Sequence, residues 1–353
     1  MIVTIAWERA LHQRGALSAY AVGEDCVVLH ERRTRLVCVE RADGTVRWDI
    51  PLGTWPRGIA LSGDRVLVLP QEPDLLSCVD LRTGELLWSA RTPRFTGGVV
   101  ATEDTVVVGG WRGYTPMTGL DLADGRVRWT TTSPVHSVQP LAWGGGVLTG
   151  SGAEVVLVDA HDGSGLARWR LPEPLFQRDG AVFTPLGTDR FVAGCGQASL
   201  VALGLGSDEP DWRGAYEPFA RFESVGGAVW MHRPRTGFLT VDPADGTRLW
   251  STGTGVGQQR VAGAVPHADG FLVGADNGGI YRLGSDGQAV SRCSLGRRID
   301  EMIDAGDGGL FVMAKGTFAS VAVTARGNAT VPPPAASATS GRLTDITTDR
   351  ARP

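Results

Sequence analysis

Apolar and polar residues alternate along most of the chain in short runs, and tight turns separate the runs. Short alternating runs predict β-strands rather than helices, because successive side chains of a strand point to opposite faces. The clearest runs come in pairs around an Asp-Gly or Thr-Gly step, as in LVCVERADGTVRW (36–48) and LTVDPADGTRLW (239–250). Glycine at this place supplies the positive φ of a tight hairpin. Each phrase therefore predicts two antiparallel strands joined by a tight turn.

The hairpin phrase recurs at intervals of 38 to 43 residues. Its closing residue marks the period, at Trp7, Trp48, Trp88, Trp129, Trp169, Trp212, Trp250 and, in the eighth place, Cys293. Two further strand-like runs lie between one phrase and the next, as in GIALSGDRVLVLP (58–70). Each period thus predicts four strands, and four antiparallel strands per about 40 residues are typical of a β-propeller blade.

The two ends of the chain complement each other. Residues 299–324 hold three strand-like runs without a fourth, while the N-terminal run IVTIAW (2–7) has no three runs before it. Together they complete one blade. The sequence therefore predicts an all-β, eight-bladed propeller over residues 1–325, closed by the N-terminal strand. Residues 326–353 lack the strand pattern, and we expect them to form a disordered tail.

The phrase Asp-x-x-Thr/Asp-Gly-x-x-x-Trp, intact in 80–88, 121–129 and 242–250, resembles the repeat of PQQ-like eight-bladed propellers. That family includes quinoproteins and BamB-like proteins, and the resemblance covers about nine-tenths of the chain. It implies the same fold, with the repeated tryptophans as docking residues between blades. Function is left open, because one fold serves many functions.

The resemblance does not extend to a cofactor. PQQ-dependent dehydrogenases of this family are longer and typically carry a vicinal cysteine pair and a calcium site. Here the five cysteines, Cys26, Cys38, Cys78, Cys195 and Cys293, are widely spaced. The histidines show none of the short spacings of metal sites. We therefore expect neither cofactor nor metal, and no PQQ-dependent dehydrogenase activity.

The composition of the chain narrows the classes of molecule that it is expected to bind. The 353 residues carry a formal charge of −4, and a single lysine, Lys315, argues against the basic stripe that nucleic acid requires. No stretch has the ~18 uninterrupted apolar residues of a membrane helix. BamB-type proteins are exported and lipid-anchored, whereas the N-terminal sequence shows no export pattern. We expect a cytoplasmic monomer without membrane contact.

Strand order assigns the loops to two faces. The hairpin-turn face holds the turns that join strands one to two and three to four of each blade. It collects aspartates, which turn chemistry alone explains. The connection face holds the loops between strands two and three and between blades, and arginines and aromatic residues gather there. Because turn chemistry does not require arginine, we expect this face to bind a protein partner or an anionic small molecule.

Loops that begin the innermost strands can reach the central channel. The residues expected to bind a ligand there or on neighbouring loops are Arg57, Trp111, Arg112, Tyr114, Arg178, Arg221, His232, Gln259, Arg260 and Arg298. Candidate acid–base residues at the channel mouth are His136, Glu223, Asp300 and Glu301. They leave open an alternative function, in which a biosynthetic isomerase, cyclase or lyase uses acid–base chemistry without a redox cofactor. A solvated ring of ion pairs would explain the same residues.

Overall fold

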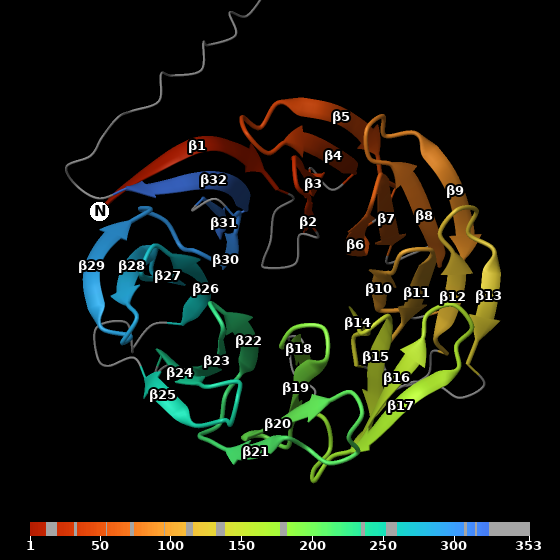
Figure 1. The fold of residues 1–353 in the computed structure, drawn as a ribbon. Coiled ribbons are helices and arrows are strands. Elements are labelled where there is room, and N and C mark those ends of the chain that lie inside the picture. Colours follow the sequence, from red (N-terminus) through yellow and green to blue (C-terminus); the bar gives the residue numbers. More distant parts are fainter. Residues whose placement is uncertain are drawn as a thin grey trace, which may run out of the picture.

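The computed structural model of the protein describes residues 1–11, 20–31, 34–53, 55–70, 74–94, 96–110, 116–131, 138–176, 182–233, 237–251, 260–306, 309–314 and 316–324. All regular elements in these ranges are β-strands, and they form eight four-stranded antiparallel sheets. The sheets are arranged as blades around a central axis (Figure 1). The prediction of an all-β, eight-bladed propeller is confirmed. Within these ranges, no helix is long and apolar enough to cross a membrane.

The first four blades follow one another along the chain. Blade 1 comprises β2 (Tyr20–Val22), β3 (Cys26–Glu31), β4 (Arg35–Glu40) and β5 (Val46–Pro51). Blade 2 comprises β6 (Pro56–Ser62), β7 (Arg65–Pro70), β8 (Leu75–Asp80) and β9 (Leu86–Arg91). Blade 3 comprises β10 (Gly98–Ala101), β11 (Thr105–Gly109), β12 (Thr118–Asp121) and β13 (Val127–Thr130). Blade 4 comprises β14 (Leu141–Trp143), β15 (Gly146–Ser151), β16 (Glu154–Asp159) and β17 (Gly165–Arg170).

The remaining blades complete the circle. Blade 5 comprises β18 (Phe183–Pro185), β19 (Arg190–Cys195), β20 (Ser199–Gly204) and β21 (Trp212–Ala215). Blade 6 comprises β22 (Arg221–Val225), β23 (Ala228–Arg233), β24 (Gly237–Val241) and β25 (Arg248–Ser251). Blade 7 comprises β26 (Val261–His267), β27 (Gly270–Ala275), β28 (Gly279–Gly284) and β29 (Ala289–Ser294). Blade 8 comprises β30 (Glu301–Asp304), β31 (Leu310–Ala314), β32 (Thr317–Thr324) and β1 (Ile2–Ala10).

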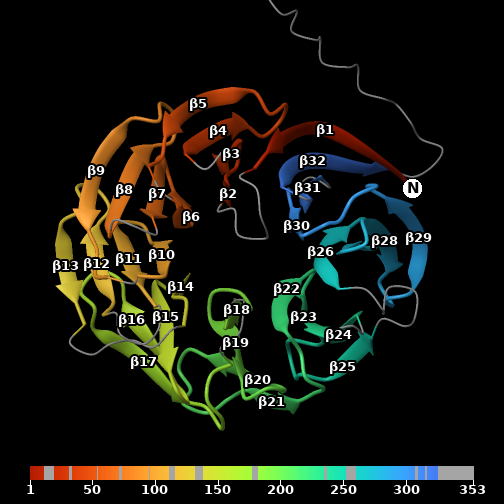
Figure 2. The ribbon, with the colours of Figure 1, turned by 180° about the vertical axis from the view of Figure 1, so that it is seen from behind.

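The N-terminal strand closes the ring, as the sequence predicts. Strand β1 pairs antiparallel with β32, from Ile2 opposite Thr324 to Ala10 opposite Thr317. The two strands lie side by side at the outer edge of blade 8 in both views (Figures 1 and 2). A salt bridge of 2.7 Å between Arg9 Nε and Glu31 Oε1 then ties β1 to blade 1. Strand pairing and this ion pair together join the last blade to the first.

The apolar core lies between neighbouring blades. Strands β3, β11 and β19 read as continuous apolar runs because both faces of these sheets are covered. One core cluster combines Cys26 and Cys38 of blade 1 with Val66 and Val68 of blade 2. Outer strands such as β9 instead alternate between buried and exposed positions. No blade has a sufficient core of its own, so each blade depends on its neighbours.

The repeated tryptophans dock one blade on the next. The indole N–H groups of six of them donate to a backbone carbonyl of the following blade at 2.8 to 3.0 Å: Trp7 to Arg41, Trp48 to Leu81, Trp88 to Leu122, Trp129 to Ala160, Trp169 to Ser207 and Trp212 to Pro243. The ring of Trp250 packs against the turn glycine Gly287 of the next blade. The acceptors lie in the hairpin turns that join strands three and four. The docking role implied by the resemblance is therefore confirmed for these six residues.

The turn glycine serves this docking as well as the turn. Gly84 has φ +76°, and a Cβ placed on it would lie 2.9 Å from the ring of Trp48. In the same way, a Cβ placed on Gly125 would lie 2.4 Å from the ring of Trp88. A larger residue would push the preceding blade's indole away, in addition to straining the backbone.

Hydrogen bonds confirm the assignment of loops to two faces. On the hairpin-turn face, the turn at 41–45 contacts the turn at 23–25 through Arg41 N and Asp25 O, 2.8 Å apart. On the connection face, the segment after β9 contacts the loop before β8 through Thr92 N and Asp74 O, 3.1 Å apart. The beginnings of all inner strands therefore share the connection face.

Replacing Gly84, which packs against Trp48, is expected to lower the free energy of unfolding more than replacing a turn glycine that packs against no other residue. For Gly84→Ala we expect the free energy of unfolding to fall by about 2–5 kcal/mol, from backbone strain and overlap with Trp48. Gly63 is the control, because it has φ +54° but no atom within 4 Å of a built Cβ. Gly63→Ala should cost only about 1–2 kcal/mol. Urea unfolding measures both, and equal losses would contradict the docking role.

Removing residues 1–8 is expected to open the ring. The deletion removes most pairs between β1 and β32 and the indole that anchors blade 8 to blade 1. We expect a larger loss of unfolding free energy than for Trp7→Ala alone, which should cost about 3–5 kcal/mol. Thermal and urea unfolding measure both proteins. An unchanged melting temperature after the deletion would disprove closure by β1.

Candidate functional site

Five titratable side chains from three blades meet where the inner strands begin. We call this group the axial cluster: Tyr20, Arg221, Glu223, His232 and Glu301. Tyr20, Arg221 and Glu301 are the first residues of inner strands β2, β22 and β30. The three strands line one side of the central axis of the propeller (Figure 1). The cluster therefore lies at the axial end of the connection face.

Glu223 and His232 form the tightest contact of the cluster. His232 Nε2 lies 2.5 Å from Glu223 Oε1, and the histidine is 5% exposed. Burial disfavours the charged imidazole and lowers the pKa of His232. Burial alone would raise the pKa of Glu223, but the hydrogen bond to His232 and the charge of Arg221 outweigh it and lower that pKa. Both shifts favour a neutral imidazole beside an ionised carboxylate, an arrangement in which the proton of the contact lies on His232 Nε2.

Tyr20 and Glu301 form the second contact. The Tyr20 hydroxyl donates to Glu301 Oε1 at 2.8 Å. Burial raises the pKa of Glu301 above its ordinary value, although the bond from Tyr20 and the charge of Arg221 partly oppose the rise. Burial and the neighbouring Glu301 also raise the pKa of Tyr20, so its hydroxyl stays protonated. The two glutamates of the cluster thus have pKa values shifted in opposite directions.

Small residues in blade 7 allow the charge of Arg221 to affect both the Glu223–His232 contact and the Tyr20–Glu301 contact. Arg221 Nη2 donates to the carbonyl of Ala262 in β26 at 2.9 Å. The next residue, Gly263, lies against β30 so closely that a Cβ would be 2.5 Å from the Met302 carbonyl oxygen. The guanidinium of blade 6 therefore reaches across blade 7, where its charge affects Tyr20 and Glu301.

Only some of the site residues that the sequence predicts lie close together in the structure. Arg221, Glu223, His232 and Glu301 come together in the axial cluster. Asp300 instead pairs with Arg298, with Arg298 Nε 2.9 Å from Asp300 Oδ1. Arg260 is exposed ahead of β26, and Arg57 lies in β6. Six predicted residues fall outside the described residues: Trp111, Arg112, Tyr114, His136, Arg178 and Gln259.

Sequence reasoning missed Tyr20. It compared the loops before the inner strands of blades 2 to 8 and left out blade 1, where the run before β2 carries no tryptophan phrase. Tyr20 opens β2 as Arg221 opens β22. Extending the same comparison to blade 1 would have placed Tyr20 at the channel mouth.

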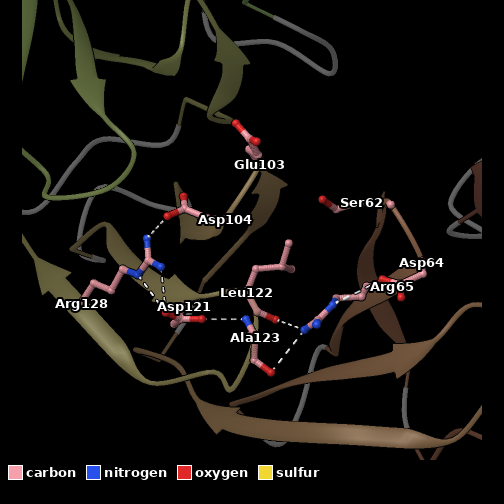
Figure 3. Close-up of a pocket in the computed structure, with 10 residues that line it drawn as sticks. Ser62, Asp64, Arg65, Glu103, Asp104, Asp121, Leu122, Ala123 and Arg128 are labelled. Atoms are coloured by element: carbon pink, nitrogen blue, oxygen red, sulfur yellow. Dashed lines mark hydrogen bonds and ion pairs between the residues drawn. The ribbon is translucent and has the colours of Figure 1, made fainter.

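A pocket of about 580 Å³ lies on the other face, between blades 2 and 3 (Figure 3). It is lined by Ser62, Gly63, Asp64, Arg65, Glu103, Asp104, Asp121, Leu122, Ala123 and Arg128. Sequence analysis attributed the acids of this hairpin-turn face to turn chemistry and predicted no pocket there. The pocket arises only when neighbouring turns are brought together.

Many polar atoms of this pocket take part in hydrogen bonds and ion pairs, some between blades 2 and 3 and some within blade 3. Arg65 donates to the carbonyls of Leu122 and Ala123 in the next blade. Arg128 contacts Asp104 and Asp121 at 2.6 and 2.7 Å (Figure 3). Its guanidinium lowers the pKa of Asp104 to about 2. These contacts hold adjacent turns in place, and they leave few donors for a ligand.

The described residues contain no group of three or more His, Cys, Asp or Glu side chains arranged to hold a metal ion. The four cysteines Cys26, Cys38, Cys78 and Cys195 are buried in the blades and unpaired, and Cys293 is half-buried. Burial raises the pKa of Cys78 to about 11, which disfavours the reactive thiolate there.

Fold and repeat together define an eight-bladed β-propeller that resembles the PQQ-like propellers. The family model of the outer membrane protein assembly factor BamB matches residues 72–224. Those residues include two of the three intact repeats, 80–88 and 121–129, and the resemblance is confirmed. A search of curated proteins found no match.

Two solved structures share the whole architecture. BamB from Moraxella catarrhalis superposes with a TM-score of 0.73 at 16% identity, covering 92% of this chain and 99% of that chain. The computationally designed Ika8 protein superposes with a TM-score of 0.69 at 14% identity, covering 89% of this chain and 98% of that one. At these identities the likeness concerns the fold.

The raised pKa of Glu301 predicts a pH-dependent effect of Glu301→Gln. A carboxyl with a raised folded pKa stabilises the fold most at pH values below its ordinary pKa, and this contribution is lost as the pH rises through the folded pKa. Gln cannot ionise, and its amide oxygen can still accept from Tyr20. We therefore expect the variant to be more stable than wild type at about pH 7 and the difference to shrink at about pH 4.

Denaturant unfolding of both proteins at the two pH values measures this effect. Glu103→Gln is the control, because Glu103 is an exposed carboxylate on the hairpin-turn face. A Glu301→Gln difference that does not change with pH would contradict the burial of an ionisable carboxyl.

Proposed function

We propose that this propeller is a recognition protein whose connection face binds a protein partner. The supporting observation is an exposed tryptophan on that face. Trp55, directly before inner strand β6, is 39% exposed, whereas the docking residues Trp7 and Trp48 are at most 8% exposed. Tryptophan and arginine are the residues that most often dominate the free energy of protein–protein binding. An indole held at a strand end offers such an anchor.

Exposed guanidinium groups accompany the indole. The side chains of Arg94 and Arg298 are 85% and 58% exposed, and both precede inner strands. Arg260 is also exposed and has no ionic partner among the described residues. These arginines favour a partner surface with carboxylates, because a guanidinium can bind a carboxylate by two parallel hydrogen bonds. The same groups would serve an anionic small molecule.

The comparisons support a protein partner in general terms. The matching family model is that of an assembly factor, and an assembly factor acts on other proteins. That likeness identifies no particular partner for this chain.

Capture experiments with matched variants test the proposal. Immobilised wild type, Trp55→Ala and Arg260→Ala are incubated with an extract of the cells that produce the protein, and bound proteins are quantified by mass spectrometry. We expect one partner to be captured by wild type and reduced at least about tenfold by Trp55→Ala, because losing a central aromatic contact costs about 2 kcal/mol or more. Arg260→Ala should weaken capture chiefly at low salt, where surface charges are least screened.

Leu86→Ala is the control for a merely exposed apolar side chain. Leu86 is 63% exposed on outer strand β9, away from the connection face. The control should capture the partner as wild type does. Equal capture by all four proteins, or no partner for wild type, would disprove the proposal.

A further inference from the structure

Within the described residues, each carboxyl group of the axial cluster forms a hydrogen bond through one of its two oxygens. Glu223 Oε1 contacts His232 Nε2, and Glu301 Oε1 accepts from Tyr20. In the part of the chain that the structure describes, no hydrogen bond reaches the second oxygen of either group. Both residues are half-buried and therefore retain access to solvent. Two oriented carboxyl oxygens are thus available to a ligand.

The two carboxyl groups differ in protonation. Glu223 has a lowered pKa and Glu301 a raised one. Between those two values, Glu223 is ionised while Glu301 is protonated. A pair of carboxyl groups whose surroundings separate their pKa values in this way can supply a base and an acid at the same time.

The charges of the cluster balance when Glu301 is protonated. Arg221 is then the only cation and Glu223 the only anion of the five, while His232 and Tyr20 are neutral. A neutral ligand therefore enters without adding an unpaired charge. The guanidinium remains suited to polarise a carbonyl oxygen, because within the described residues its one hydrogen bond is from Nη2 to the carbonyl of Ala262.

We propose that the axial cluster is a proton-transfer site for a small neutral hydroxycarbonyl compound of the aldose or ketose class. Glu223 is the base, Glu301 the acid, and Arg221 the group that binds the carbonyl oxygen. This activity is separate from the docking of a protein partner and does not depend on it.

The reaction is a shift of a proton between adjacent carbons. The Glu223 carboxylate takes a proton from the carbon next to the carbonyl, and the electron pair of that C–H bond forms a C=C bond. The carbonyl oxygen takes the Glu301 proton, which gives an enediol. Glu301 then recovers a proton from the neighbouring hydroxyl as the C=O bond forms there, and Glu223 returns its proton to the former carbonyl carbon. The product is the isomer, and no oxidant or reductant is consumed.

Deuterium incorporation from D₂O tests this proposal. Dihydroxyacetone is the neutral probe and pyruvate the anionic one, and ¹H NMR follows the loss of their C–H signals between about pH 5 and 8. We expect wild type to exchange dihydroxyacetone at least about tenfold faster than buffer. Glu223→Gln should lose on the order of 100-fold, the usual contribution of a general base.

Glu217→Gln is the matched control, because Glu217 is a 54% exposed carboxylate that pairs with Arg233 of the same blade. It should exchange as wild type does. Equal rates for wild type and Glu223→Gln, or no exchange above buffer, would overturn the proposal. Exchange of pyruvate without dihydroxyacetone would overturn the neutral substrate class. Melting curves of each variant verify that a lost rate is not lost folding.

Tyr20 and His232 are positioning residues, and the pH profile distinguishes this role from a structural one. The Tyr20 hydrogen bond lowers the pKa of Glu301, so Tyr20→Phe should move the alkaline limb of the profile to higher pH. The His232 hydrogen bond lowers the pKa of Glu223, so His232→Asn should move the acidic limb to higher pH. Unmoved limbs in both variants would show that the two carboxyl groups do not set the rate.

Discussion

The contact between a tryptophan and the glycine turn of the next blade is the interaction on which this propeller depends. One indole both donates to the turn's carbonyl and packs where a Cβ would otherwise be, as for Trp48 with Leu81 and Gly84. A single blade cannot bury both faces of its sheet, so the fold exists only when such contacts form around the ring. The N-terminal strand provides the last contact through Trp7. Strand β1 therefore contributes the same kind of contact to the ring as the outer strands of the other blades.

Because of this mode of docking, the two faces of the propeller take part in different kinds of contact. On the hairpin-turn face, many contacts hold neighbouring blades together. The backbone carbonyls of the turns accept hydrogen bonds from the indoles and from arginines such as Arg65 and Arg190. Its aspartates also bond to backbone N–H groups within the turns, as Asp43 does with Thr45. The connection face is not needed for these contacts. On that face, the indole of Trp55 and the guanidinium groups of Arg94 and Arg298 are exposed to solvent, and the two arginines pair with Asp74 and Asp300.

The axial cluster shows how a regular repeat produces an irregular site. In blade 7, the inner strand β26 carries three consecutive small residues, Ala262, Gly263 and Ala264. The small residues bring β26 against β30 and let Arg221 influence Glu301 across a blade. The small side chains of β26 thus allow charged groups from neighbouring blades to lie close together on one side of the axis.

The sequence by itself determined the architecture, because the strand pattern and the Asp-Gly and tryptophan positions are local and repeat every blade. It also indicated Arg221, Glu223 and Glu301 as residues near the axis, since strand order places the beginnings of inner strands together, and it indicated His232 on a neighbouring connection of the same face. Only the tertiary structure decided which of them meet. Tyr20 and Glu301 are 281 residues apart in sequence and 2.8 Å apart in space, and Asp300, next to Glu301, is drawn instead to Arg298. Ring closure and the packing between blades set those distances, and no local pattern encodes them.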